Sequence, residues 1–310
     1  MAIDSPSNSR RVRIFHVNAF TTRAFAGNPA GVVLHAERLG DQEMQRIARE
    51  LNVGDTIFLL PPDGPDHDLR ARFFTPHAET GFVGHASLAA HAVLAALGLP
   101  PCRRQKQRNG TVEFERLSDG AGASYAFTQL PPPVQRVLDD RALAPLLAAL
   151  GVQADELDPR CPAIAAGAGG SRALIAVRAG ATLARLAPDL PQLAALTAAG
   201  APAGYFVYTR SPAVPGCKTE ARMFCPAIGI PEDPVSGNAH AMLGVHLYAL
   251  GLLAADDSGA RFVARQGHHM DRPGTLTVRV FAEGGTMRAV QIAGTAVIVF
   301  DAIIELPPAS

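Results

Sequence analysis

The chain has 310 residues, enough for one large domain or for two domains of about 150 residues each. Hydrophobic residues make up 48% and charged residues 18%, which excludes a disordered chain and favours a large globular core. Basic and acidic residues balance at 28 each without a run of one sign, so nucleic acid and anionic membranes are disfavoured as partners and a small molecule is favoured.

The sequence favours a cytoplasmic protein. Residues 1–10 lack the apolar core of a signal peptide and are predicted to be a flexible tail. No apolar run reaches the roughly 18 residues that a membrane helix needs. The four cysteines lie far apart without a CxxC pair, which is typical of reduced thiols.

In the first half, alternating apolar residues predict strands over residues 11–17, 68–74 and 111–116. Residues 41–51 have the apolar spacing of an amphipathic helix, with Asp41 as its predicted cap and Asn52 as its end. Three successive prolines at 131–133 predict a boundary. The predicted domains are therefore 1–130 and 131–310, with a return of the last strand to the first domain left open.

The second half is predicted to open with a helix over residues 139–150. Strands are predicted within residues 171–178, 204–210, 275–281 and 294–300.

The two halves share a pattern that predicts a duplication. "RFFTP" at 72–76 matches "RMFCP" at 222–226, and a charge-free segment follows each, Gly84–Gly98 and Gly237–Gly251. A helix that is apolar all round must be buried on every side. The predicted fold is α+β, with two similar domains, each a rolled, mostly antiparallel sheet around a buried central helix. The alternative is that alanine-rich helices resemble each other by composition alone.

Metal and thiol chemistry are disfavoured. His85 with His91, and His240 with His246, are six residues apart, which places the two rings of each pair on different helix faces. Cys225 follows a strand and is predicted to be a small core residue. No metal and no cofactor are predicted.

Acid and base side chains gather instead near the two helix starts. They are Asp55, Glu79, His85, Glu232 and Asp233. Acid/base catalysis suits carboxylates in an apolar setting, and helix starts can bind a carboxylate through free N–H groups. The alternatives are that Asp233 only caps the second helix and that Asp55 is an ordinary turn residue.

Several segments in order resemble the PhzF-like isomerases of phenazine biosynthesis, which have the diaminopimelate-epimerase-like fold. They are "VNAFTTRAFAGNPAGVV", "ARELNVGDTIF", "RFFTPHAETGFVGHASLAAHAVL", "GGSRALIAV", "RMFCPAIGIPEDPVSGNAH" and "RQGHHMDRPG". The resemblance covers nearly the whole chain. It implies a cofactor-free isomerase that moves a proton within a small unsaturated acid, which in the type member is trans-2,3-dihydro-3-hydroxyanthranilate.

The resemblance also implies roles for individual residues. Asp55 would be the proton shuttle, His85 would assist it, and Asp233 would hold polar groups of the substrate. Backbone or side-chain hydrogen bonds to the substrate would come from Gly84, Gly237, Asn238 and Ala239.

The chain departs from the family pattern at several of these places. The family usually has glutamate at Asp55, so the shorter carboxylate must act on a different substrate or from a shifted backbone. It commonly has Ser or Thr at Asn238, and the amide changes how an acid is oriented. Related racemases carry a cysteine before each central helix, where this chain has Val83 and Ser236.

The predicted function is therefore a cofactor-independent isomerase that uses carboxylate acid/base catalysis in a cleft between the domains. A racemase or epimerase of amino or hydroxy acids, and an inactive protein that binds a small acid, are the alternatives. A homodimer is predicted because dimers are the commonest closed assemblies and because the resemblance suggests one.

Overall fold

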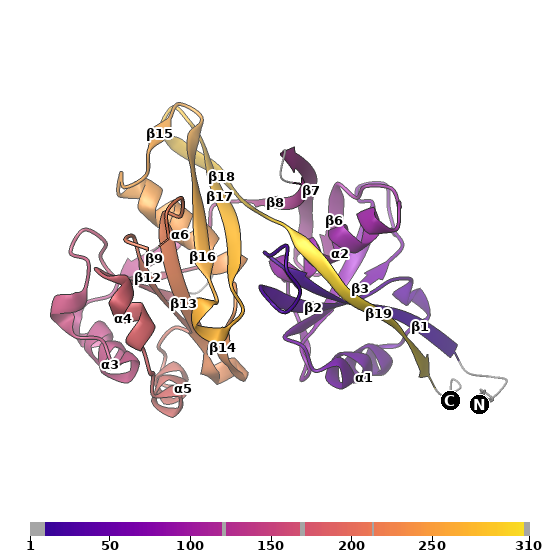
Figure 1. The fold of residues 1–310 in the computed structure, drawn as a ribbon, viewed down its shortest axis with the longest axis horizontal. Helices are drawn as coiled ribbons and strands as arrows, with labels where there is room; N and C mark the ends of the chain where they lie inside the picture. The colour runs from indigo at the N-terminus through magenta and orange to yellow at the C-terminus, as the bar shows by residue number, and fades with distance from the viewer. Residues whose placement is uncertain (1–9, 120–121, 168–170, 213, 307–310) are drawn as a thin grey trace. The chain divides into compact units, whose positions relative to one another are not determined.

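The computed structural model describes residues 10–119, 122–167, 171–212 and 214–306. Residues 1–9 of the predicted tail lie outside these ranges, whereas Arg10 already begins a strand. The described chain is α+β and rich in strands (Figure 1). None of its helices has the length and apolar character needed to span a membrane.

Nineteen strands and six α-helices are described. The helices are α1 (Asp41–Leu51), α2 (Gly84–Ala96), α3 (Asp140–Leu150), α4 (Gly180–Arg185), α5 (Leu190–Ala198) and α6 (Gly237–Ala249). The first nine strands are β1 (Arg10–Ala19), β2 (Asn28–Val33), β3 (Asp55–Leu60), β4 (Leu69–Phe74), β5 (Glu79–Thr80), β6 (Arg104–Gln107), β7 (Gly110–Asp119), β8 (Gly122–Gln129) and β9 (Val134–Val137). The others are β10 (Ile164–Ala166), β11 (Arg172–Val177), β12 (Gly204–Thr209), β13 (Thr219–Cys225), β14 (Ile230–Asp233), β15 (Ala255–Asp256), β16 (Gly259–Gln266), β17 (Gly274–Glu283), β18 (Thr286–Gly294) and β19 (Ala296–Leu306).

The chain forms two compact units. Unit 1 contains the described residues up to Phe25, then Pro29–Tyr125 and the described residues from Thr295 onwards. Unit 2 contains Ala26–Asn28 and Ala126–Gly294. Within unit 1, the C-terminal strand β19 pairs antiparallel with β1 along its whole length.

Helix α2 is the central helix of unit 1. It carries no charged residue, and its Ala86, Ala89, Ala90 and Val93 share one core with strand residues such as Phe73. The amphipathic helix α1 packs on a second core, which contains Met44 and Ile47. The sheet of unit 1 therefore has α2 on one face and α1 on the other, because β3 sends Ile57 to the first core and Phe58 to the second.

Unit 2 repeats this arrangement around α6. Met242 and Leu243 of α6 pack with Leu174 and Phe206 of the strands. On the opposite face, α3, α4 and α5 cover a core that includes Ile175. Successive residues of β11 thus point to opposite cores, as the pleat of a strand requires.

The strand pairings of the two units correspond to one another. In unit 1, β3 lies parallel to β2 and antiparallel to β4, and β4 also pairs parallel with β6 and antiparallel with β5. In unit 2, β12 lies parallel to β11 and antiparallel to β13, and β13 pairs parallel with β16 and antiparallel with β14. The central helix follows β5 in one unit and β14 in the other, so composition alone does not explain the similarity.

Both central helices end in the same way. Gly98 and Gly251 have φ values of 67° and 66°, a left-handed conformation that glycine adopts without steric cost. The N–H groups of Leu99 and Leu252 turn back to the carbonyls of Leu94 and Leu247, at 2.9 Å in each case. The two equally spaced glycines in the sequence are therefore helix ends.

An arginine–glutamate pair occurs at the same place in both repeats. Arg72 of β4 donates two hydrogen bonds to Glu79 of β5, at 2.8 and 2.9 Å. Arg222 of β13 donates two to Glu232 of β14, each at 2.8 Å. Glu79 and Glu232, which the sequence offers as acid/base candidates, are therefore held in structural ion pairs.

The predicted cap of α1 needs correction. Gly40 is the N-cap, and Asp41 lies in the first turn, where its carboxylate accepts a hydrogen bond from Arg72 at 2.6 Å. Helices α4 and α5 are additional to those that the sequence predicts.

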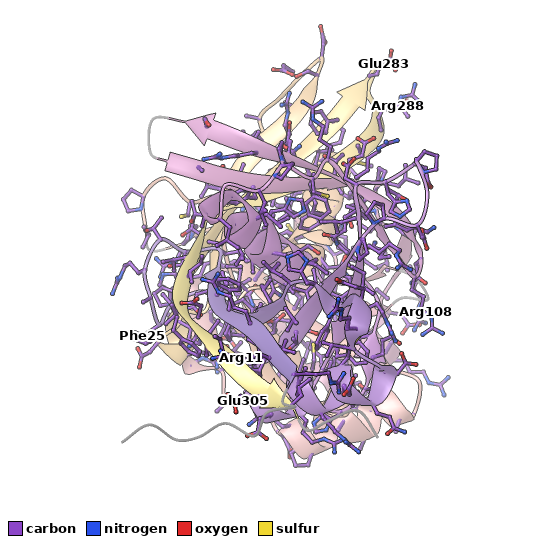
Figure 2. All side chains as sticks on the ribbon, turned by 90° about the vertical axis from the view of Figure 1, so that its right-hand side faces the viewer. Arg11, Phe25, Arg108, Glu283, Arg288 and Glu305 are labelled. Atoms are coloured by element: carbon purple, nitrogen blue, oxygen red, sulfur yellow. The ribbon has the colours of Figure 1, made fainter. Side chains whose placement is uncertain are left out.

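Some charged side chains form exposed pairs on neighbouring strands. Figure 2 labels Arg11 and Glu305, which approach to 4.0 Å on the paired strands β1 and β19, and Glu283 with Arg288, at 3.3 Å between β17 and β18. All four side chains are exposed, so these pairs contribute little to stability.

We expect the two repeated ion pairs to differ in their effect on stability. Arg222 and Glu232 are 9% and 14% exposed, whereas Arg72 and Glu79 are 29% and 31% exposed. Glu232→Gln leaves a buried guanidinium without its counter-charge and should lower the free energy of unfolding by about 3–5 kcal/mol. Glu79→Gln should cost about 1 kcal/mol, because Arg72 keeps Asp41 and meets solvent. Urea unfolding of both variants measures the difference, and equal losses would contradict the assignment.

Candidate active site

Asp55 and His85 lie together in unit 1. Asp55 is the first residue of β3, and His85 is the second residue of α2. The Asp55 Oδ2 atom is 3.7 Å from the His85 Nε2 atom, and the two side chains are 13% and 11% exposed. The sequence repeat placed His85 at the helix start, and the fold brings the carboxylate of Asp55 to it.

His85 is held as a neutral imidazole. Burial lowers its pKa to about 4, against the opposing effect of a hydrogen bond to the backbone of Pro29. Proline has no N–H, so the ring must donate to its carbonyl. Because Nε2 is buried and has no hydrogen-bond partner among the described residues, Nδ1 is the donor. The unprotonated Nε2 therefore faces Asp55, ready to accept a proton or a hydrogen bond.

Asp233 is the predicted site residue of unit 2. It ends β14, partly buried, three residues before the N-cap of α6. Its Oδ1 accepts a hydrogen bond from Asn28 Nδ2 at 2.7 Å, and the same amide donates to the carbonyl of Val235 at 2.9 Å. The carboxylate also accepts hydrogen bonds from the Val235 backbone and the Ser236 hydroxyl.

Burial raises the pKa of Asp233 to about 6, although the bond from Asn28, the charge of Arg172 and the other hydrogen bonds act to lower it. Asp233 therefore changes its protonation state close to neutral pH. Such a carboxyl can both accept and donate a hydrogen bond within the physiological range.

The start of α6 is arranged by neighbouring side chains. Ser236 is the N-cap, and its hydroxyl accepts from the Ala239 N–H at 3.4 Å. Asp233 is therefore not the cap of this helix. Gly237 and Asn238 are the first two residues of α6, at positions whose N–H groups have no intrahelical acceptor.

The side chain of Gln266 fixes the segment between Asp233 and α6. Gln266 is 1% exposed, donates to the Asp233 carbonyl at 2.6 Å and accepts from the Ser236 N–H at 3.1 Å. This one amide therefore binds the backbone on both sides of Pro234 and Val235.

In unit 1, α2 begins at Gly84 after Val83. Val83 has no polar side chain with which to cap the helix. The first turn of α2 thus keeps N–H groups that no cap side chain occupies.

Three consecutive residues each contact one of the predicted catalytic residues. Asn28 donates to Asp233, Pro29 accepts from His85, and Ala30 of β2 pairs in register with Asp55 of β3. The segment "GNPAG" belongs to a stretch that resembles the PhzF-like isomerases, but the sequence predicts no role for Asn28. The sequence alone does not identify Asn28 as a site residue, because its partner Asp233 lies 205 residues away in the chain.

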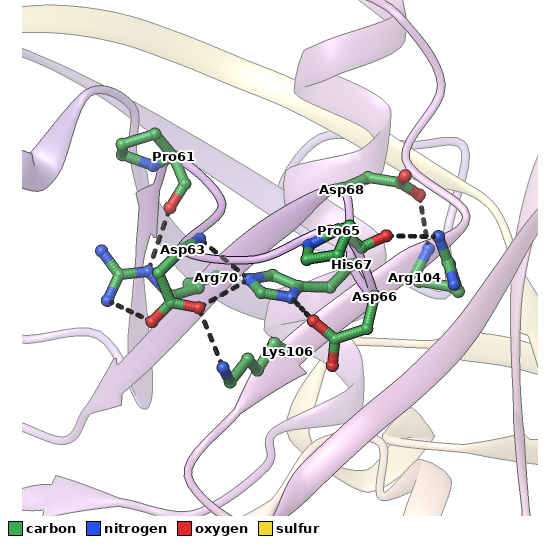
Figure 3. Close-up of polar contacts among 9 residues, drawn as sticks. All are labelled: Pro61, Asp63, Pro65, Asp66, His67, Asp68, Arg70, Arg104 and Lys106. Atoms are coloured by element: carbon green, nitrogen blue, oxygen red, sulfur yellow. Dashed lines mark hydrogen bonds and ion pairs between the residues drawn. The ribbon is translucent and has the colours of Figure 1, made fainter.

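Another polar cluster lies between β3 and β4 (Figure 3). The His67 ring is fully buried, accepts from the Asp63 N–H at 3.2 Å and bonds Asp66 at 2.7 Å. Asp63 also pairs with Arg70 at 3.1 Å and Lys106 at 2.8 Å. The groups of this cluster are paired with one another, so it stabilises the turn and is not a candidate active site.

A cavity of about 340 Å³ adjoins this cluster, and neither Asp55 nor His85 lines it. Arg70 and Arg72 line it, but both already hold carboxylates.

Among the described residues, no three His, Cys, Asp or Glu side chains gather closely enough to hold a metal ion. The four cysteines are free thiols. Burial raises the pKa of Cys225 to about 12, so this thiol is protonated and lies in the core as a small apolar residue.

The comparisons with known sequences and structures agree on one family. Residues 17–302 match the sequence profile of the "phenazine biosynthesis-like protein" family. An uncharacterized isomerase of Escherichia coli, YddE, is 37% identical over 294 residues, covering 94% of this chain and 97% of its own. The trans-2,3-dihydro-3-hydroxyanthranilate isomerase of Pseudomonas aeruginosa is 30% identical, covering 90% of this chain and 94% of its own.

Solved structures show the same fold. The crystal structure of a PhzF-family phenazine biosynthesis protein from Bacillus anthracis superposes with a TM-score of 0.86 at 24% identity. The superposition covers 96% of this chain and all of that one.

We expect Asn28 to control the ionisation of Asp233. Asn28→Ala removes a hydrogen bond that favours the carboxylate, so the pKa of Asp233 should rise above its value of about 6. At pH 6 to 7 a larger fraction of Asp233 then carries a proton. Carboxyl-carbon NMR titration measures the shift, with Asn109→Ala on the surface as a control. An unchanged or lowered pKa in Asn28→Ala would contradict the assigned contact.

Proposed function

The chain belongs to the phenazine biosynthesis-like protein family and is an isomerase, and we propose that it moves a proton within a small unsaturated carboxylic acid without a cofactor. The observation that carries this proposal is the buried pair of Asp55 and a neutral His85 at 3.7 Å. A carboxylate beside an unprotonated imidazole forms an acid/base pair that needs no further group.

In the proposed reaction, the Asp55 carboxylate removes a proton from one carbon of the substrate and returns it to another. While Asp55 holds the proton, its O–H can donate to Nε2 of His85, which has no hydrogen-bond partner among the described residues. His85 thus stabilises the protonated form of Asp55 and fixes its orientation. This lowers the barrier of a shuttle in which one group first takes and then gives a proton.

Asp233 and the start of α6 are proposed to bind the polar groups of the substrate. A carboxyl with a pKa of about 6, raised by burial, can accept a hydrogen bond from an amine or a hydroxyl of the substrate. The N–H groups of Gly237 and Asn238 belong to the first turn of α6, where the helix dipole favours a carboxylate. In unit 1, Gly84 offers the same kind of group at the start of α2.

The aspartate at position 55 changes the position from which the carboxylate acts, compared with the glutamate of the usual family member. A separation of 3.7 Å is longer than a hydrogen bond, and glutamate would extend the carboxylate by one methylene. In this chain the substrate must therefore lie closer to β3, or the carboxylate must move when the substrate binds.

A racemase with two thiols is a weaker candidate. Val83 and Ser236 are the N-caps of α2 and α6, the places at which the related racemases are expected to carry cysteine. Neither side chain can exchange a proton with a carbon atom as a thiolate does. Cytoplasmic location and a homodimer remain predictions.

We expect the native protein to isomerise trans-2,3-dihydro-3-hydroxyanthranilate or a close analogue in deuterium oxide, with solvent deuterium appearing in the product. Asp55→Asn should lower turnover at least about 100-fold, because the amide cannot take the proton. Asp55→Glu should keep or raise turnover. Proton NMR follows substrate, product and isotope in one experiment.

The matched control is Asp257→Asn, which removes an exposed carboxylate from unit 2. If only Asp55→Glu turns over, the scaffold is that of an isomerase and this chain acts on another acid. Full activity of Asp55→Asn would refute the proton shuttle.

A further inference from the structure

Arg172 is the first residue of β11 and lies on the same face of the sheet as α6. Leu174 and Ala176, two and four residues further on, belong to the core that α6 covers. Because alternate residues of a strand share a face, the Arg172 side chain also points to the α6 side. Its position at the end of the strand leaves it only partly buried.

The absence of a side chain at Gly204 leaves the space that the Arg172 side chain occupies on the sheet. Gly204 of β12 is the register partner of Arg172. A Cβ atom at Gly204 would lie 2.7 Å from Arg172 Cδ, 2.7 Å from Met223 Cε and 2.9 Å from Cys225 Sγ. The arginine therefore crosses β12 towards β13, over the space that any larger residue at position 204 would fill.

Asp233 lies further along the same path. Met223 of β13 is the register partner of Asp233 of β14. The positive charge of Arg172 acts on both neighbours, since it lowers the pKa values of Asp233 and Cys225 against the larger effect of burial. The positive charge of Arg172 therefore acts in the region of Asp233, ahead of α6.

Arg172 differs from Arg210 and Arg222 of unit 2 because no carboxylate of the described residues lies within ion-pair distance of it. Its Nε atom is buried without a hydrogen-bond partner among those residues, and Nη1 donates to the carbonyl of Ser171 at 3.0 Å. In contrast, Arg222 holds Glu232 and Arg210 holds Asp158. A buried donor without an acceptor is unfavourable unless a ligand supplies the acceptor.

We propose that Arg172 binds the carboxylate of the substrate, next to Asp233 and the first turn of α6. This inference rests on the proposed function and assigns a residue to the carboxylate of the substrate. A guanidinium binds a carboxylate through two parallel hydrogen bonds, which Lys cannot reproduce. A second carboxylate facing Asp233 would be repelled. The substrate group that faces Asp233 is therefore a hydrogen-bond donor, from which the Asp233 carboxylate accepts.

The test compares an acid with its uncharged amide, so that it does not depend on turnover. Equilibrium titration with 2-aminobenzoate and 2-aminobenzamide gives the preference of each protein for the acid. The native chain should prefer the acid, and Arg172→Met should reduce that preference by about 10- to 100-fold. Arg172→Lys should retain part of it, because the charge stays while the paired hydrogen bonds are lost.

Two further variants separate binding from folding. Arg261→Met removes an exposed arginine of β16 and should leave the preference for the acid unchanged. Gly204→Ala keeps the guanidinium but obstructs its path, and should also reduce the preference. No preference in the native chain, or the same preference in Arg172→Met, would overturn the proposal. A native chain that prefers the acid but isomerises nothing would refute the proposed function and retain the role of Arg172.

Discussion

Burial of a helix on every side is the constraint on which the rest of this structure depends. Helices α2 and α6 contain no Asp, Glu, Lys or Arg, and their side chains pack in the cores of their units. A β-sheet must curve around such a helix to bury it. The backbone N–H and C=O groups at the helix ends then need partners outside the helix. The glycines at 98 and 251 satisfy the C-terminal ends. At the N-terminal ends, His85 lies in the first turn of α2 and Asp233 shortly before α6.

The two repeats use one scaffold for different polar groups. Each places an arginine–glutamate pair on the strands before its central helix, which fixes the approach to the helix start. At that start, unit 1 carries His85 with Asp55 close by, whereas unit 2 carries Asp233 with Asn28. The two units thus share their packing and differ in the side chains around each first turn, because unit 1 carries a carboxylate beside an imidazole and unit 2 carries a carboxylate bound by an amide.

Burial shifts the pKa values of His85 and Asp233 in opposite directions. It lowers the pKa of His85 to about 4 and raises the pKa of Asp233 to about 6, because in both cases the charged form is disfavoured. At neutral pH His85 is therefore an uncharged hydrogen-bond acceptor, and the pH is close to the pKa of Asp233. Neither property follows from the residue type, since an exposed histidine would be half-protonated well above pH 4.

The sequence by itself determined the elements whose signal is local. The charge-free segments and their bracketing glycines predicted both central helices, and the family segments pointed to Asp55, His85 and Asp233. Only the tertiary structure decided which side chains meet, because Asn28 and Asp233 are 205 residues apart and no periodicity links them. The same holds for Arg172, whose position depends on a glycine in the next strand. It also holds for Glu79 and Glu232, each of which pairs with an arginine of the preceding strand. Local patterns fix helices and strands because they reflect backbone and burial preferences within one segment, whereas pairing across a sheet is set by the register of strands that lie far apart in the chain.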